Sequence, residues 1–304
     1  MIVADEFITW AETYRKPFIQ YATWVKYLST ESHLRLLFPN KTIKQLSKMD
    51  VQQAFNKLGE KLQKRTIKTV HQHFKSFIGE MYDDGKIKLN IANNIRIGGV
   101  EKAKSKNEFL EIAEREKLLN SLDLMNPKDL MIYIALLYGL RFAEVLGLQV
   151  IDIIKEGNVN DGCLINIIKT MDYKYTKSFK ETKTKDSVRD VPLSKVSYQH
   201  IRKYIKHHKL EQHDCLFPMT FPSSLNRYLS QKCKKLDIPR ISFHGLRHTC
   251  GSYLLKNGIP MITVSEILGH ADMDITQKIY IHLLDEQRND DRKMILRLLN
   301  KELS

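Results

Sequence analysis

The residues best suited to chemistry lie between positions 241 and 282, where polar side chains recur in an otherwise apolar text. They are His244, Arg247, His270 and Tyr280. Arg247 follows His244 by three positions, so on a helix both side chains can share one face. A guanidinium matches two phosphate oxygens, an imidazole exchanges protons near neutral pH, and a tyrosine hydroxyl can act as a nucleophile. Together these residue types suit transfer of a phosphoryl group to the tyrosine.

An apolar stripe separates these polar positions and predicts two short helices. Gly258 and Gly269 stand where the C-caps of such helices belong, because glycine tolerates the left-handed backbone. The stripe consists of Leu254, Leu255, Met261, Val264, Ile267 and Leu268.

Phosphoryl transfer also requires a second arginine, because negative charge spreads over the non-bridging oxygens in the transition state. Arg141 is the candidate. It lies at a corner between the apolar segment 130–137, which we expect to be a buried helix after the cap Asn126-Pro127, and a new helix at 142–148. The alternative for Arg141 is a structural salt bridge to Glu144 or Asp152.

A proton donor for the leaving alkoxide is the remaining requirement, and Lys183 is the candidate. The sequence pattern predicts a strand at 164–168. The Lys-Asp-Ser segment at 185–187 is predicted to form the turn of a hairpin between two further short strands. Lys183 would project from near the tip of this hairpin into a bound substrate. The alternative is an ordinary solvated lysine.

Composition describes a globular protein with a basic surface. The 304 residues are 42% hydrophobic and 28% charged, which suggests about two domains, and the net charge is +14. Such a charge favours a polyanionic partner such as nucleic acid, although a merely solvated basic surface is the alternative.

No feature of the sequence predicts a metal site, a disulfide framework or a membrane segment. The four cysteines lack Cys-x-x-Cys spacing and a paired histidine pattern, so we expect reduced thiols in a cytosol. The longest apolar run, 130–140, is too short to span a bilayer, and the N-terminus lacks the basic region of an export signal. We therefore expect a cytoplasmic protein.

Residues 1–98 are predicted to form a helical domain of about four helices. Asp50 is the expected N-cap of one helix, and Thr66 is the expected cap of the next, which Gly85 ends. The basic residues Lys64, Arg65, Lys68 and Lys75 would form its outer face. A basic helical domain without catalytic groups is most simply a clamp on DNA, and a plain solvated face is the alternative. Apolar residues at helical spacing are Phe7, Trp10, Ala11 and Tyr14, then Tyr21, Trp24, Val25 and Leu28, then Val51, Phe55 and Leu58.

Two further segments follow this domain. Residues 99–108 lose the apolar period and gain Gly, Ser and Lys, which indicates a linker. Residues 109–304 would form a second domain, with further helices expected at 111–121, 195–209 and 223–236.

The motifs together resemble the tyrosine recombinases of the phage integrase family. They are Arg141 in Tyr-Gly-Leu-Arg-Phe-Ala-Glu-Val-Leu-Gly-Leu, Lys183 in Thr-Lys-Thr, His244-Gly-Leu-Arg247-His, Leu-Gly-His270, and Tyr280 ten residues later. The N-terminal part resembles the family's helical core-binding domain. Two departures are the apparent lack of an arm-site-binding domain and Asn93-Asn94 in place of the customary Asn-Pro.

The resemblance implies a mainly helical α+β fold whose two domains form a clamp around duplex DNA. Tyr280 would attack the scissile phosphate and leave a 3′-phosphotyrosine and a free 5′-hydroxyl, with His244 helping to accept the tyrosine proton. The phosphotyrosine retains the bond energy, so no cofactor is required. Metal is not needed, because the arginines supply the positive charge.

The same resemblance assigns the other residues. Arg141 and Arg247 would clamp the non-bridging oxygens, Lys183 would protonate the leaving 5′-oxygen, and His270 would donate a hydrogen bond to the phosphate. It also implies a homo-tetramer on two DNA sites, integration or excision of a mobile element in a bacterium or phage, and room for an accessory DNA-bending or directionality factor. The apolar residues Met294, Ile295, Leu298 and Leu299 predict a C-terminal helix that docks on a neighbouring protomer or on its own domain.

Three alternatives use parts of the same pattern. A type IB topoisomerase or a hairpin telomere resolvase would use similar residues. A DNA-binding architectural protein would have kept the fold without the chemistry, which the intact set of six residues argues against. A histidine-rich metallohydrolase would need the clustered carboxylates that divalent metals prefer.

Overall fold

The computed structural model describes residues 1–101, 109–155, 163–182 and 187–269. The chain divides into two compact units, Met1–Lys104 and Ser105–Ser304. The predicted C-terminal helix lies outside the described residues, as do residues 102–108 of the predicted linker.

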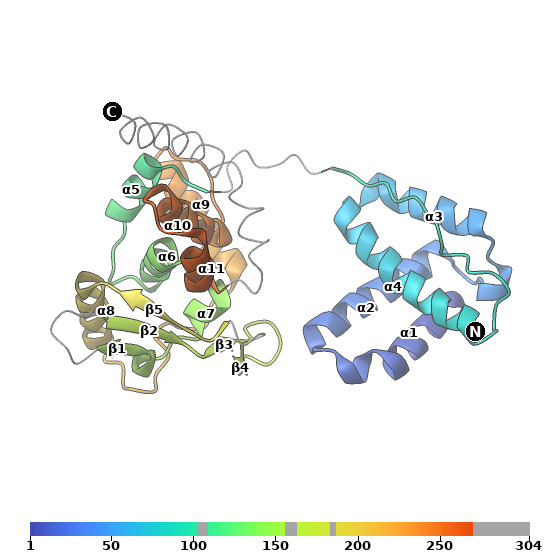
Figure 1. Ribbon diagram of the computed structural model, residues 1–304, viewed down its shortest axis with the longest axis horizontal. Coiled ribbons are helices and arrows are strands. Elements are labelled where there is room, and N and C mark those ends of the chain that lie inside the picture. The colour runs from blue at the N-terminus through green and yellow to red at the C-terminus, as the bar shows by residue number, and fades with distance from the viewer. Residues whose placement is uncertain (102–108, 156–162, 183–186, 270–304) are drawn as a thin grey trace, which may run out of the picture. The chain divides into compact units, whose positions relative to one another are not determined.

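The N-terminal unit is helical, and the sequence prediction of about four helices is confirmed (Figure 1). Its core consists largely of aromatic side chains, among which Phe7, Phe55, Phe74 and Phe77 are 0% exposed. The rings of Phe7 and Phe77 meet edge to face with their centroids 5.6 Å apart, a favourable geometry for aromatic pairs. The helices are α1 (Val3–Tyr14), α2 (Tyr21–Leu37), α3 (Lys48–Lys61) and α4 (Lys64–Asp83), with short 3₁₀ turns at Lys16–Phe18 and Ile43–Gln45.

Two predicted helix starts in this unit are wrong. The N-cap of α3 is Ser47, and Asp50 lies one turn inside the helix, where its carboxylate accepts hydrogen bonds from the backbone N–H and the hydroxyl of Ser47. Helix α4 begins at Lys64 after Gln63, before the predicted cap Thr66. In α3 and α4 the apolar period therefore predicts the buried face but not the first residue of the helix.

The buried face of α2 also differs from its apolar spacing. Trp24, Tyr27, Thr30 and Leu34 are buried, whereas Tyr21 and Leu28 on the predicted stripe are exposed. The burial of Thr30 is explained by the hydrogen bond between its hydroxyl and Nδ1 of His73 on α4, at 2.9 Å.

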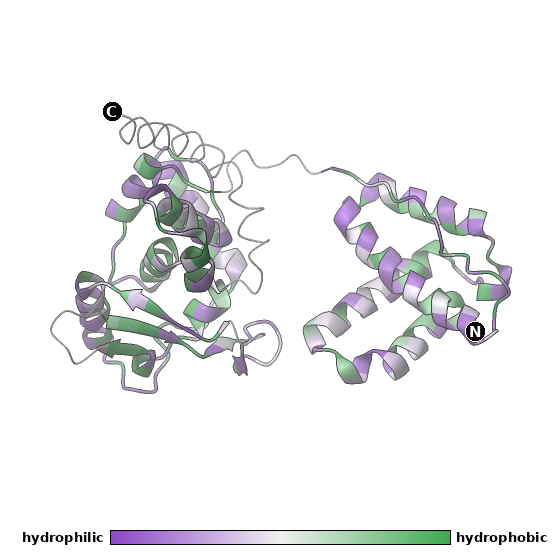
Figure 2. Ribbon diagram, viewed as in Figure 1, coloured by the Kyte–Doolittle hydropathy of each residue, from purple (hydrophilic) through white to green (hydrophobic). Residues whose placement is uncertain are grey.

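The second unit is built around helix α6 (Pro127–Tyr138), which the sequence correctly predicts to be buried. The side chain of Asn126 caps it by accepting the N–H of Lys128 at 2.9 Å, and Pro127 opens its first turn. The helix is strongly hydrophobic (Figure 2) and packs against α10 on one side and strand β5 on another. The other helices are α5 (Ile112–Asn120), α7 (Phe142–Leu146), α8 (Lys195–His207), α9 (Pro222–Lys235), α10 (Phe243–Lys256) and α11 (Met261–Leu268).

Two small antiparallel sheets complete the described part of this unit. One has the order β1 (Ile153–Lys155), β2 (Cys163–Ile167), β5 (Arg189–Leu193), and the other pairs β3 (Lys169–Met171) with β4 (Phe179–Glu181). The fold class is therefore mainly α with small β-sheets, as predicted.

The predicted hairpin around 185–187 is wrong, because the strands on its two sides belong to different sheets. Strand β4 pairs with β3, and β5 pairs with β2. The β2–β5 pairing brings Ile165 opposite Val191 and Cys163 opposite Leu193, all buried. Core-facing side chains thus select β2 as the partner of β5, although the two strands are distant in sequence.

Candidate active site

The corner after α6 places the two predicted arginines in one region. Gly139 ends α6 in the left-handed conformation, with φ 67°, and its carbonyl accepts a hydrogen bond from Nη1 of Arg247 at 2.8 Å. Two residues later Arg141 is the N-cap of α7. A Cβ atom at position 139 would collide with the Leu268 side chain, so this corner requires glycine.

Helix α10 carries His244 and Arg247 one turn apart, as predicted. Ser242 caps it by accepting the N–H of Gly245 at 3.1 Å, which fixes the start of the helix immediately before His244. Arg247 is 1% exposed, whereas His244 is exposed. A buried guanidinium is thus held behind an accessible imidazole.

Arg141 is held by two partners and remains partly accessible. Its Nη1 donates to Oε1 of Glu144 at 2.7 Å, and its Nη2 donates to the carbonyl of Gly269 at 2.5 Å. Its side chain is 35% exposed. The salt bridge to Glu144, which the sequence offers as the structural alternative, is therefore present, whereas Asp152 pairs with Lys169. The pairing with Glu144 leaves part of the guanidinium open to a ligand.

Glu144 connects Arg141 to a third arginine that sequence analysis missed. Its carboxylate is 1% exposed and accepts Nη2 of Arg189 at 3.0 Å. Burial alone would raise the pKa of Glu144, but the hydrogen bond and charge of Arg189 and the charge of Arg141 outweigh burial and lower the pKa to about 2. The carboxylate therefore stays ionised at physiological pH. The sequence signal that could have identified Arg189 is the two-residue period of a strand, which puts Arg189 on the same face of β5 as the apolar residues Val191 and Leu193.

The site also alters the protonation of its histidines. Desolvation by the surrounding protein and the charges of Arg247 and Arg141 lower the pKa of His244 below its usual value. The ring centroid of His248 lies 4.6 Å from that of His244, and burial lowers the pKa of His248 to about 4. His244 is therefore neutral at neutral pH and able to accept a proton.

Three of the six predicted site residues, Lys183, His270 and Tyr280, lie outside the described residues. The structure brings the other three together: Arg247 donates to the carbonyl of Gly139, two residues before Arg141, and His244 lies one turn before Arg247 on α10. Gly269, whose carbonyl accepts from Arg141, directly precedes His270 in the chain.

Neither a metal cluster nor a membrane helix is found in the described part of the chain. Across those residues, no group of three or more His, Cys, Asp or Glu side chains could hold a metal ion. No helix there is both long and apolar enough to cross a membrane. The four cysteines are free.

The four predicted DNA-binding residues, Lys64, Arg65, Lys68 and Lys75, are all exposed on α4. Arg65 also lines a hollow of about 370 Å³ between α2 and α4. Helix α2 contributes Lys26 and Ser29 to this hollow, two residues that were not predicted from the sequence. Lysine, arginine and hydroxyl groups are the usual contacts to phosphate oxygens.

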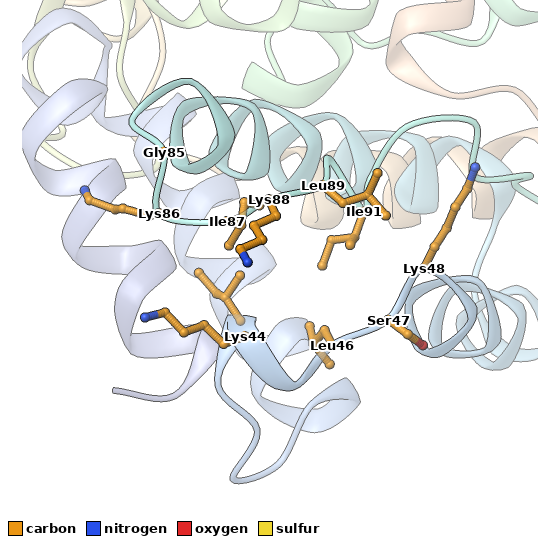
Figure 3. A pocket seen from close by; sticks show the side chains of 11 residues that line it. Lys44, Leu46, Ser47, Lys48, Gly85, Lys86, Ile87, Lys88, Leu89 and Ile91 are labelled. Carbon is orange, nitrogen blue, oxygen red and sulfur yellow. The ribbon is translucent and has the colours of Figure 1, made fainter.

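A second hollow, of about 580 Å³, lies beyond the other end of α4 (Figure 3). Its lining includes the lysines Lys44, Lys48, Lys86 and Lys88 and the apolar residues Leu46 and Ile91. Helix α4 has 20 residues and is therefore about 30 Å long, so this hollow is well separated from Lys64 and Arg65.

Comparison with known proteins identifies the family of this chain. Residues 107–287 match the model of the phage integrase family. The chain therefore belongs to the phage integrase family, the tyrosine-type site-specific recombinases.

Two curated relatives are tyrosine recombinases. A tyrosine recombinase XerC-like protein of Caldanaerobacter subterraneus subsp. tengcongensis is 27% identical over 308 residues, covering 91% of this chain and 77% of the relative. Tyrosine recombinase XerA of Saccharolobus solfataricus is 35% identical over 182 residues, covering 60% of this chain and 54% of the relative.

Solved structures share the fold. The Tn1549 transposon integrase in complex with transposon right end DNA aligns with a TM-score of 0.74 at 19% identity, covering 97% of this chain and 100% of that one. A lambda integrase dimer bound to a COC′ core site aligns with a TM-score of 0.67 at 14% identity, covering 92% of this chain and 77% of that one.

Replacing Glu144 with glutamine should destabilise the second unit. The change leaves Arg189 buried without its carboxylate, a loss on the order of 3 kcal/mol. Differential scanning calorimetry of the full chain should show the corresponding transition lowered by roughly 6 °C or more. Glu116→Gln, an exposed position on α5, is the matched control and should change stability by less than about 0.5 kcal/mol. Equal midpoints for Glu144→Gln and the wild type would contradict a stabilising role for the pair.

Proposed function

We propose that this protein cleaves and rejoins duplex DNA at specific sites through a 3′-phosphotyrosine on Tyr280. The observation that carries the proposal is the convergence of Arg141, Arg247 and a neutral His244 at one corner of the second unit. Two fixed guanidinium groups suit the two non-bridging oxygens of a phosphodiester. A neutral imidazole beside them suits proton transfer.

Each of the six residues would have a separate role in the reaction. Arg141 and Arg247 stabilise the charge that develops on the phosphate, and His244 accepts the proton of the Tyr280 hydroxyl. Lys183 protonates the 5′-oxygen as it leaves, and His270 donates a hydrogen bond to the phosphate. The bond from phosphorus to the 5′-oxygen is replaced by a phosphotyrosine bond, which a 5′-hydroxyl of a partner strand then attacks. No external energy source is needed, because one phosphodiester is exchanged for another.

The partner we propose is duplex DNA bound by both units, with four protomers on two sites. The net charge of +14 supports a polyanionic partner. The Tn1549 and lambda integrases, which share the fold, were each solved bound to DNA. We further propose that the C-terminal residues couple neighbouring protomers, that the reaction integrates or excises a mobile element in the cytoplasm of a bacterium, and that an accessory DNA-bending or directionality factor sets its direction.

Tyr280→Phe tests the nucleophile. The variant should bind a nicked suicide substrate with wild-type affinity and form no covalent complex, because phenylalanine has no hydroxyl to attack the phosphate. The measurement is a denaturing gel for protein-linked DNA. Tyr14→Phe, which removes an exposed hydroxyl from the N-terminal unit, should form the complex as the wild type does. A denaturation-resistant adduct from Tyr280→Phe would overturn the assignment.

The pH dependence of cleavage tests His244. Its lowered pKa predicts that the neutral form persists below about pH 6.5, the ordinary value. The single-turnover cleavage rate should therefore stay level from pH 8 to about 6.5 and fall at lower pH as the imidazole becomes protonated. His244→Gln should lower the rate by roughly 10²-fold or more and lose this acid limb. DNA affinity measured at each pH separates binding from cleavage, and an unchanged limb in the variant would exclude His244 as its origin.

Charge removal on α4 tests the DNA-binding surface of the N-terminal unit. Arg65→Ala with Lys68→Ala should weaken DNA binding and reduce the slope of log affinity against log salt by about 0.9 for each phosphate that is no longer neutralised. The control is Lys44→Ala with Lys88→Ala, which removes the same charge from the other hollow. A gel-shift titration at several salt concentrations measures both. Equal reduction of the slope in the two double variants would show that net charge matters and not the α4 surface.

A further inference from the structure

Arg189 is a buried arginine on β5 to which the proposed reaction gives no direct role. Its side chain is 7% exposed. Nε donates to the carbonyl of Ile267 at 2.6 Å, and Nη1 donates to Oε1 of Glu144 at 3.2 Å and to the carbonyl of Ser187 at 3.3 Å. Nη2 donates to Oε2 of Glu144 at 3.0 Å. The planar guanidinium thus uses all of its nitrogens to fix neighbouring elements.

Arg189 and Arg141 share the carboxylate of Glu144 atom by atom. Oε1 accepts from Nη1 of both arginines. Oε2 accepts from Nη2 of Arg189 and from the backbone N–H of Arg141, at 2.8 Å. The position of the carboxylate therefore sets both the backbone of Arg141 at the start of α7 and the direction of its guanidinium. Arg189 donates to both oxygens of this carboxylate.

The same guanidinium also holds the end of α11. Ile267 lies in the last turn of that helix, where carbonyls lack intrahelical partners, and Arg189 supplies a donor. Gly269 follows with φ 65°, and a Cβ atom there would lie 2.9 Å from Nη1 of Arg189. Since the carbonyl of Gly269 accepts from Arg141, the two arginines hold carbonyls two residues apart on one segment.

We propose that Arg189 is a positioning residue that holds the Arg141 guanidinium in place through Glu144 and through the end of α11. This inference rests on the proposed function, because it assigns Arg189 an effect only through the phosphate clamp of Arg141. A lysine at position 189 could keep the charge but not the set of bonds, because an ammonium is a point donor and cannot span both carboxylate oxygens and a carbonyl in one plane.

The experiment compares two scissile groups in a nicked suicide substrate, an ordinary phosphate and a methylphosphonate. The methylphosphonate lacks the negative charge of one non-bridging oxygen and therefore depends less on a charge clamp. Arg189→Lys should bind both DNAs within about twofold of the wild type and cleave the phosphate on the order of 10²-fold more slowly. On the methylphosphonate its deficit relative to the wild type should shrink to less than about tenfold, as it should for Arg141→Ala.

Two controls separate positioning from loss of stability. Asp129→Asn breaks a buried ion pair with Lys232 elsewhere in the same unit, and any effect of lost stability on cleavage should be equal for the two substrates. Gly269→Ala keeps both arginines in the chain but places a Cβ atom 2.9 Å from Nη1 of Arg189, on the residue whose carbonyl accepts from Arg141. It should reproduce the substrate dependence of Arg189→Lys and serves as the test if Arg189→Lys does not fold. Assays are run below the lowest unfolding transition among the variants.

The outcomes distinguish this inference from the proposed function. If Arg141→Ala shows equal deficits on the two substrates, the clamp assigned to Arg141 is wrong, and the inference about Arg189 falls with it. If Arg141→Ala favours the methylphosphonate but Arg189→Lys loses cleavage equally on both substrates, as expected for instability alone, the clamp stands and the positioning role is overturned. Full cleavage of the phosphate substrate by Arg189→Lys would overturn it as well.

Discussion

The second unit depends on one buried carboxylate, that of Glu144, held between Arg141 and Arg189. Removing an ionised carboxylate from water is costly, and the cost is offset here by hydrogen bonds from two guanidinium groups and a backbone N–H. Because these donors come from α7 and β5, the ion group connects a helix to a sheet. Arg189 extends the connection to the end of α11.

Arg141 and Arg247 are held in different ways. Arg247 is almost fully buried on α10 and donates to the Gly139 carbonyl, so its position follows the end of α6. Arg141 is partly exposed and shares its donors with Glu144 and Gly269. Since Gly139 and Arg141 lie on the same turn, the corner after α6 sets both guanidinium groups together. Groups placed by rigid elements need little reorganisation when a charged ligand arrives.

In the N-terminal unit the basic surface lies on an aromatic core. The ring of His73 stacks on Tyr27 with centroids 3.9 Å apart, and burial lowers the pKa of His73 to about 4. This histidine is therefore neutral at physiological pH and adds no charge to the surface above it. The positive charge of that surface comes from lysine and arginine side chains such as Lys64 and Arg65.

The sequence by itself predicted most of the helices, the family and the placement of Arg141, His244 and Arg247 near one another. Helical apolar periods, the Asn126-Pro127 start and the left-handed glycines at 258 and 269 act within a few residues, so they can be read locally. The spacing of His244 and Arg247 places both on one helix for the same reason. The wrong caps at Asp50 and Thr66 and the different buried face of α2 show that local signals predict that a helix forms better than they predict its ends or its orientation.

Only the tertiary structure decided which strands pair and what surrounds Arg141. The partner of β5 is β2 because buried side chains such as Ile165 and Val191 match across the pair, and no local turn signal encodes that match. The role of Arg189 depends on Glu144, 45 positions earlier in the chain, and on Ile267, 78 positions later. Burial of a charge and its compensation are properties of the packed interior, so they arise only when distant segments meet.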